Sequence, residues 1–128
     1  MLNILLVAVG GAFGAVCRHL LSLSALRVLG PGTIWNYGTF TANIFGSLLM
    51  GFLAGWLAFR VDGGAQWRML LGTGVLGGFT TFSSFSLETA LMVERRQYLP
   101  AAGYSLGSLV LGVMALFIGL WIARRLFA

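Results

Sequence analysis

The chain has 128 residues, of which 59% are hydrophobic and only 9% are charged, and its formal net charge is +5. A soluble domain would carry about a quarter of charged residues, so this composition excludes a soluble globular protein and indicates an integral membrane protein. The eight basic residues are arginines scattered along the chain, which argues against a basic surface that binds nucleic acid.

Four segments are long and apolar enough to cross a membrane, which requires about 20 mainly apolar residues. In chain order they are Leu2–Leu26, Tyr37–Phe59, Trp67–Val93 and Leu99–Leu126. Turn-forming or charged residues join them, and they leave no room for a soluble domain. The sequence therefore predicts an all-α integral membrane protein with one domain, residues 1–128, of four transmembrane helices.

The first segment, Leu2–Leu26, lacks a basic region before its apolar run, so we expect a spanning helix of the mature protein and not a signal peptide. Arg18 lies near the far end of this helix. The single Cys17 excludes an intrachain disulfide, and His19 is the only histidine. Redox chemistry and a zinc site are therefore not expected.

The arginines give little indication of the orientation in the membrane. One face would carry Arg60, Arg68, Arg124 and Arg125, and the other Arg27, Arg95 and Arg96, with Arg18 close to it. Cytoplasmic loops normally hold the excess of basic residues, so two alternatives stay open: one orientation with a weak signal, or insertion in both orientations. Two copies in opposite orientations would form an antiparallel homodimer, similar to the inverted repeats of many transporters.

Every predicted span contains a pair of glycines four residues apart. The pairs are Gly10/Gly14, Gly51/Gly55, Gly74/Gly78 and Gly103/Gly107. In lipid, helices associate largely through close backbone approach at small residues. We therefore expect tight helix packing at these pairs.

Polar residues recur at helical spacing in two spans. Thr39, Asn43 and Ser47 form one stripe in the second span, and Tyr104 and Ser108 form a shorter one in the fourth. Such groups often stabilise contacts between helices. Asn43, however, lies near the middle of the bilayer, where a carboxamide is costly unless it faces protein or water.

The third span contains GGFTTFSSFS, Gly77–Ser86, with two glycines and five hydroxyl side chains. Gly77 and Gly78 weaken a helix by roughly 1 kcal/mol each relative to alanine, and the hydroxyls compete for backbone hydrogen bonds. We predict a break in the helix here. Freed carbonyls at such breaks coordinate small cations such as sodium.

Phe79, Phe82 and Phe85 are spaced by three residues, which is typical of packing, although the positive edge of an aromatic ring also favours an anion. Uncharged donors with aromatic edges suit a small, strongly hydrogen-bonding anion. Glu88, one turn beyond Phe85, is either an interfacial carboxylate or a proton-sensitive group at a pore mouth.

Three motifs in the chain resemble the CrcB/Fluc family of fluoride channels. They are GGAFGAVCRH (Gly10–His19), GTFTANIFGSLLMG (Gly38–Gly51) and GVLGGFTTFSSFSLE (Gly74–Glu88). The resemblance implies a homodimer of antiparallel subunits with two pores that pass fluoride passively. It also implies a multi-pass protein of the cytoplasmic (inner) membrane, in contact with lipid, that is not an enzyme and has no nucleic-acid partner.

The resemblance also assigns roles to particular residues. Phe82 and Phe85 correspond to the family's paired rings, and Asn43 to its pore-lining asparagine. A structural sodium ion (Na+) would be held by the backbone carbonyls of Gly77 and Thr80. Four further residues would line the anion pathway: Ser83, Ser84, Tyr104 and Ser108. Arg18 matches an arginine in the first span of the family and would have a structural or electrostatic role.

Three other functions are compatible with four apolar spans. A small dual-topology multidrug or cation exporter needs a carboxylate deep in the bundle, and the first span has no acidic residue. A scaffold would leave Asn43 and the predicted break unexplained. An intramembrane hydrolase would need a nucleophile–base pair, and no such partner accompanies His19.

Overall fold

The computed structural model describes residues 1–60 and 62–128. Four of its helical segments are long and apolar enough to cross a membrane: Leu2–Leu29, Tyr37–Leu57, Gly64–Glu94 and Tyr98–Phe127. Each end lies within three residues of the predicted one. The prediction of an all-α protein with four spans is confirmed.

The first two spans are separated by a loop whose residues fix both helix ends. Helix α1, Leu2–Leu29, ends at Gly30, which has a φ of 78° that favours glycine. Helix α2, Tyr37–Leu57, begins after Asn36, whose side chain accepts a hydrogen bond from the Thr39 amide at 3.2 Å. This N-cap satisfies one of the free amides of the first turn.

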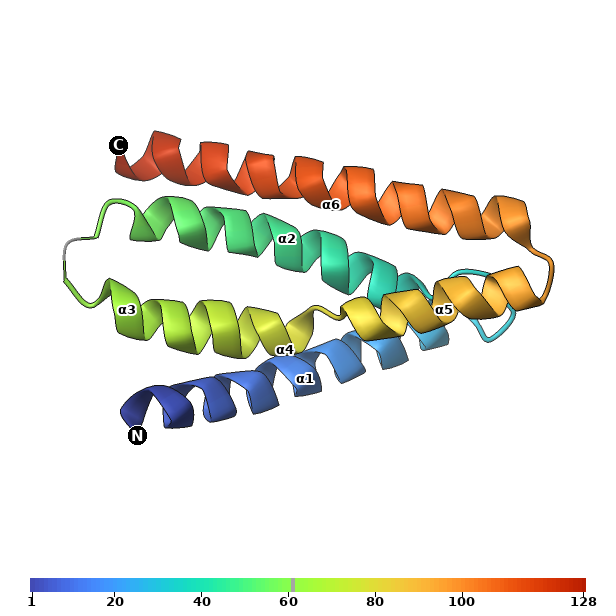
Figure 1. Cartoon of the computed structure of the whole chain (residues 1–128), viewed down its shortest axis with the longest axis horizontal. Coiled ribbons are helices and arrows are strands. Elements are labelled where there is room, and N and C mark those ends of the chain that lie inside the picture. The colour runs from blue at the N-terminus through green and yellow to red at the C-terminus, as the bar shows by residue number, and fades with distance from the viewer. Residues whose placement is uncertain (61) are drawn as a thin grey trace.

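The third span consists of four helical pieces. Helix α3, Gly64–Trp67, continues into a π-helix, η1, Arg68–Leu76, and then into α4, Gly77–Phe79. After an interruption, α5 runs over Phe82–Glu94. The predicted break in this span is therefore present, and in Figure 1 it is the extended link between α4 and α5.

The last helix, α6, spans Tyr98–Phe127 and follows a turn in which Arg96 has a φ of 58°. Figure 1 shows both termini and the turn between α2 and α3 at one end of the molecule, with the other two connections at the opposite end. This arrangement agrees with the two faces assumed in the arginine count.

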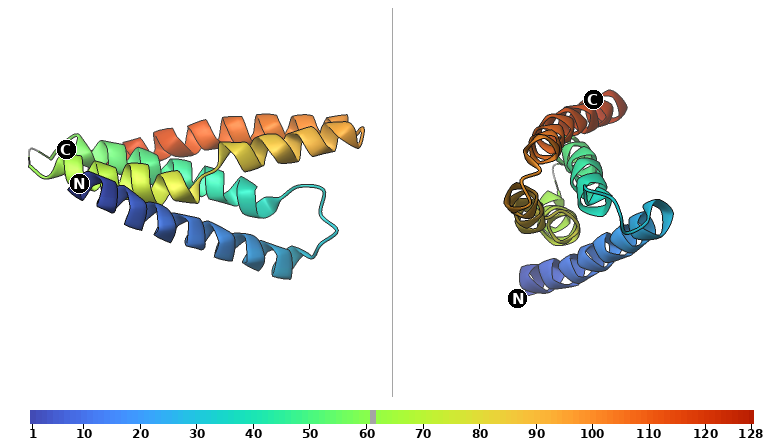
Figure 2. Two further views of the ribbon diagram at one scale, coloured as in Figure 1. Left: turned by 60° about the horizontal axis from the view of Figure 1, so that its bottom comes forward. Right: turned by 90° about the vertical axis from the view of Figure 1, so that its right-hand side faces the viewer.

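The helices form two pairs of close neighbours. Helix α2 packs along α6, and α1 packs along η1 and α4. In the end-on view of Figure 2, α1 and α6 lie on opposite sides of the molecule, with α2 and the broken span between them. The break therefore lies between the outer helices α1 and α6, next to α2.

Glycines allow close contact within both pairs of helices, as predicted. A Cβ at Gly51 would overlap the carbonyl oxygen of Leu116, and a Cβ at Gly14 would overlap that of Val75. Gly78 likewise meets the backbone of Gly11. Small residues thus let these backbones approach each other, which favours association in lipid.

One predicted packing pair behaves differently. Gly103 and Gly107 on α6 face the rings of Trp35 and Phe40, not a neighbouring backbone. Close backbone approach by α6 uses Gly119, where a Cβ would overlap the carbonyl oxygen of Leu48. The expectation that Gly103/Gly107 bring two backbones together was wrong, because aromatic side chains occupy the space that these glycines leave.

Candidate functional site

The break in the third span is bound by a side chain of α2. Thr80 and Thr81 have extended backbone, with ψ of 156° and 117°. The Thr81 amide donates to Asn43 Oδ1 at 2.8 Å, and Asn43 Nδ2 donates to the Thr81 carbonyl at 3.1 Å. Asn43 therefore satisfies both polar groups of the Thr81 backbone, which a continuous helix would have bonded within itself.

The break occurs after the glycines that were expected to cause it. Gly77 and Gly78 are helical, and the turn of α4 closes with hydrogen bonds from the Thr80 amide and hydroxyl to the Leu76 carbonyl, at 2.9 and 2.8 Å. The lack of a side chain at Gly78 allows contact with Gly11. The break lies within the predicted stretch Gly77–Ser86, at Thr80 and Thr81, and not at the two glycines themselves.

The helix restarts at Thr81, which is the N-cap of α5. Its Oγ1 accepts a hydrogen bond from the Ser84 amide at 3.2 Å and donates to Ser84 Oγ at 3.1 Å. Ser83 Oγ lies 3.4 Å from the same Thr81 oxygen. The structure thus brings Ser83 and Ser84 to the break beside Asn43.

Glu88 is the centre of the second polar cluster. Its Oε1 accepts hydrogen bonds from Asn36 Nδ2 at 2.7 Å and from Thr39 Oγ1 at 2.8 Å. Its Oε2 accepts from the Tyr104 hydroxyl at 2.5 Å. Donors from α6, from α2 and from the residue preceding α2 therefore converge on one carboxylate of α5, which compensates for removing its charge from water.

Aromatic rings connect the two polar clusters. The rings of Phe85 and Tyr104 are stacked, with centroids 5.5 Å apart and an interplanar angle of 26°. Phe82 lies 5.8 Å from Phe85 in a tilted arrangement. Tyr104 is fully buried, whereas Phe82 is 80% exposed. The two phenylalanines singled out from the sequence are thus neighbours, and one of them faces outward from this chain.

Ser108 lies one turn after Tyr104 on α6. Its Oγ is buried and has no hydrogen-bond partner among the residues that the structure describes. A buried hydroxyl in that state costs free energy, because most such groups are bonded to protein or water. Ser108 is therefore an unused donor inside the helix bundle.

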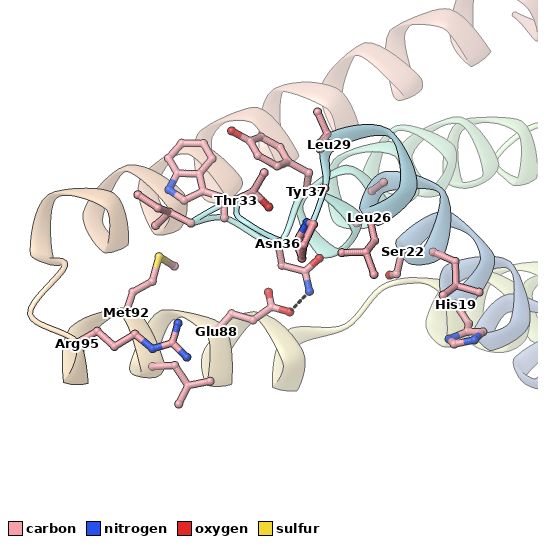
Figure 3. A pocket seen from close by; sticks show the side chains of 18 residues that line it. His19, Ser22, Leu26, Leu29, Thr33, Asn36, Tyr37, Glu88, Met92 and Arg95 are labelled. Carbon is pink, nitrogen blue, oxygen red and sulfur yellow. Dashed lines mark hydrogen bonds between the residues drawn. The ribbon is translucent and has the colours of Figure 1, made fainter.

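Two hollows flank these clusters. The larger, of about 380 Å³, lies between the end of α1, the following loop and α5; Glu88, Asn36, His19 and Arg95 are among its lining residues (Figure 3). The smaller, of about 270 Å³, lies at the break and includes Asn43, Ser47, Thr80, Thr81 and Phe82. Both hollows contain neutral hydrogen-bond donors.

Sequence reasoning underestimated Glu88 and did not connect it to Thr39 or Asn36. Thr39 was part of the polar stripe of α2, and Glu88 lies seven residues after Thr81. Residues seven apart lie on one face of a helix. That spacing was the available signal, but the donors come from other helices.

The fold and the site together define a class of protein. This is a multi-pass membrane protein with four candidate spanning helices, an interrupted third span and an interior lined by hydroxyl, carboxamide and aromatic groups. Such interiors, in which irregular backbone is bonded to protein at membrane depth, are typical of channels and transporters.

Comparison with known proteins gives the family. Residues 5–120 match the family model described as "CrcB-like protein, Camphor Resistance (CrcB)". The chain is 63% identical over 129 residues to the "Fluoride-specific ion channel FluC" of Phenylobacterium zucineum (strain HLK1), covering all of both chains. The protein of that name from Caulobacter vibrioides (strain NA1000 / CB15N) is 57% identical, also over the whole of both chains.

A third relative with the same name, from Novosphingobium aromaticivorans, is 56% identical over 118 residues, or 92% of this chain and 93% of that protein. The chain belongs to the CrcB family, as its motifs indicated. The names of these relatives denote channels and not enzymes, in agreement with the expectation of a protein without enzymatic activity.

Proposed function

We propose that this chain is a fluoride channel that passes fluoride passively across the cytoplasmic (inner) membrane. Similarity to fluoride-specific channels over the full length of the chain supports this function. The observation that carries it is the pairing of Asn43 with the broken helix next to Phe82, which is 80% exposed. These groups, none of which is charged, would form one wall of the pathway.

In this proposal, the pathway uses neutral groups to replace the water of a small anion. The Ser108 hydroxyl has no partner among the described residues, and Asn43 uses one of its two N–H donors on Thr81. An ion must shed water to enter, and its new contacts must be favourable but weak enough to allow release. Fluoride gains more than the larger chloride from such short contacts.

The rings of Phe82 and Phe85 would contact the anion near the break. Phe82 and Phe85 lie 5.8 Å apart near the break, and ring edges carry partial positive charge. In a single chain the outward face of Phe82 is uncovered. We propose that a second copy in the opposite orientation covers it, so that residues of both copies line each of two antiparallel pores.

The balanced arginines support a dual-topology homodimer, because neither end of the molecule has a clear excess of positive charge. A structural sodium ion at the centre of this dimer is a further part of the proposal. The Thr81 amide, which would bond the Gly77 carbonyl in a continuous helix, instead binds Asn43. Likewise the Ser84 amide, which would bond the Thr80 carbonyl in a continuous helix, binds Thr81 Oγ1. The carbonyls of Gly77 and Thr80 therefore fit a cation site, where the ion would supply a fixed positive charge.

A small multidrug or cation exporter stays as the second candidate, because Glu88 places an acidic residue within the third span. Proton exchange would require that carboxylate to be free for a cationic substrate. In the structure, three donors from Asn36, Thr39 and Tyr104 occupy it. This arrangement favours a fixed hydrogen-bond acceptor over an exchange site.

Anion efflux from liposomes that contain the purified protein tests the proposed function. We expect fluoride to leave the liposomes and chloride to be retained, and no movement of a drug cation. Phe82→Ile should reduce fluoride efflux at least tenfold, whereas Phe59→Ile should not, since Phe59 is a 46% exposed ring beyond the end of α2, at the turn that leads to α3. Equal passage of chloride, or drug transport without fluoride efflux, would refute the proposal.

A further inference from the structure

An apolar groove of about 410 Å³ runs between α2 and η1. Its lining includes Leu49 and Phe52 of α2, Leu71 of η1 and Phe127 of α6, and it ends at Trp56. The groove belongs neither to the Asn43 cluster nor to the Glu88 cluster. Its lining is entirely apolar side chains.

A second hollow, of about 560 Å³, lies at the turn that connects α2 to α3. It is lined by Arg60, Asp62 and Arg68, together with Gly63 and the first residues of α3. Two guanidinium groups and one carboxylate line it, so the hollow carries an excess of positive charge. Its chemistry suits an anion.

The two hollows follow one another along the same pair of helices. On α2 the groove ends at Trp56 and the basic hollow begins at Leu57. On the opposite side, the groove is lined by Leu71 and the basic hollow by Arg68, one turn earlier. The basic hollow therefore lies at the end of the molecule that carries the α2–α3 turn, which Figure 1 shows. Along both helices the apolar groove is thus followed by a hollow that two arginines line.

Tryptophan rings mark the junction between the hollows. The Arg60 guanidinium lies 4.4 Å from the ring centroid of Trp56, a cation–π contact that holds its charge near the groove. The ring of Trp67 meets that of Trp56 edge-on, with centroids 6.0 Å apart. Tryptophan is enriched at the level of lipid headgroups, which favours a position for this junction at the boundary between acyl chains and phosphate.

We propose that these hollows form a binding site for one anionic phospholipid. The upper part of an acyl chain occupies the apolar groove, and the headgroup phosphate lies beside Arg60 and Arg68. The order of the two chemistries along the membrane normal matches a phospholipid, whose apolar chains continue into a charged headgroup. A second copy of the chain could fill the groove, but it would not require the basic hollow that follows. The proposal does not depend on which ion the protein transports.

Native mass spectrometry of the purified full-length chain, with phosphatidylglycerol and phosphatidylcholine of identical acyl chains, tests this site. We expect preferential retention of phosphatidylglycerol. A basic side chain near the membrane surface contributes about a fivefold effect on binding of anionic lipid, so Arg60→Gln and Arg68→Gln should each weaken retention about fivefold. Arg27→Gln, a matched change at the opposite end of the molecule, should have no effect.

A second variant tests the groove separately. Leu49→Trp should fill it and reduce phosphatidylglycerol retention, because Leu49 is partly exposed and lines its wall; Leu106→Trp, at an exposed position on α6, is the control. Three results would overturn the proposal. These are unchanged retention in both arginine variants, full competition by inorganic phosphate, and a change of oligomeric state in Leu49→Trp with lipid retention intact.

Discussion

Asn43 binds both backbone polar groups of Thr81, donating to its carbonyl at 3.1 Å and accepting from its amide at 2.8 Å, although the two residues are 38 positions apart. A side chain of one span thereby replaces the backbone partners that the interrupted span has lost. Since unpaired backbone groups are very costly at membrane depth, we regard this pair as the contact that makes the interruption possible.

Replacing Asn43 by alanine should therefore destabilise the fold as well as impair transport. The variant leaves two backbone groups of Thr81 without this partner, and an unsatisfied buried group costs about 1–3 kcal/mol. We expect a loss of at least about 2 kcal/mol in unfolding by denaturing detergent, followed by tryptophan fluorescence. Asn3→Ala, at an exposed position near the start of α1, is the control, and equal stability of the two variants would contradict this role.

The hydrogen bond between Tyr104 and Glu88 should appear as a coupling energy. Tyr104 is fully buried and donates to Glu88 Oε2, and hydrogen bonds to charged groups contribute about 1.5–3 kcal/mol. A double-mutant cycle with Tyr104→Phe and Glu88→Gln should give a coupling of that size. The same cycle with Glu94→Gln, at an exposed position at the end of α5, should be additive. Additivity in the Glu88 cycle would show that the bond does not contribute.

Alanine substitutions at two glycines of α1 should change the stability of the protein in opposite directions. A Cβ at Gly14 would overlap the Val75 carbonyl oxygen, so Gly14→Ala should cost about 1–3 kcal/mol through overpacking. At Gly11 a Cβ would meet nothing closer than the Gly74 carbonyl oxygen at 4.0 Å, so Gly11→Ala should gain up to about 1 kcal/mol of helix propensity. Thermal unfolding of both variants measures the difference; equal changes would mean that α1 does not pack as described.

Ser108 and Thr89 offer a similar comparison of hydroxyl groups. Ser108 Oγ is buried without a partner among the described residues, so Ser108→Ala should leave stability unchanged or raise it by up to about 1 kcal/mol. Thr89 Oγ1 donates to the Phe85 carbonyl at 2.9 Å, so Thr89→Val should lower stability by about 1 kcal/mol. Thermal unfolding of the purified variants gives both values. If Ser108→Ala lowered stability as much as Thr89→Val, the Ser108 hydroxyl would have a hydrogen-bond partner, and this prediction would be wrong.

If copies of the chain insert in both orientations, a reagent on one side of the membrane should label only part of the molecules. In a Cys17→Ala background, Gly32→Cys places one thiol in the loop between α1 and α2, where nothing lies within 4 Å of an added Cβ. In sealed vesicles of uniform sidedness, an impermeant maleimide should label about half of the molecules. Labelling of all molecules, or of none, would show a single orientation and refute the antiparallel dimer.

The four spans and the broken third helix were predictable because apolar length, helical spacing and glycine content are local properties of the sequence. The position of the break was not. Gly78 remains helical where it packs against the backbone of Gly11, and the interruption falls at Thr81, which Asn43 binds. Both contacts join distant parts of the chain, so local helix propensity indicated the segment but not the residue.

The candidate site was predictable to a similar extent. Helical spacing identified Asn43 and Tyr104, and the structure places both in hydrogen-bonded clusters. The importance of Glu88 could not be read from α5 alone, since its three donors come from the N-cap of α2, from α2 itself and from α6. An acidic residue near a span end looks ordinary until those partners are known.

The contacts of Asn36 and Asn43 imply a constraint on segment length. These two residues are seven positions apart and bind Glu88 and Thr81, which are also seven positions apart but run in the reverse direction. An insertion or deletion of one residue between either pair would rotate one anchor by about 100° relative to the other. The number of residues in 37–42 and in 82–87 should therefore be as constrained as the identity of Thr39, Ser84 and Phe85 within them.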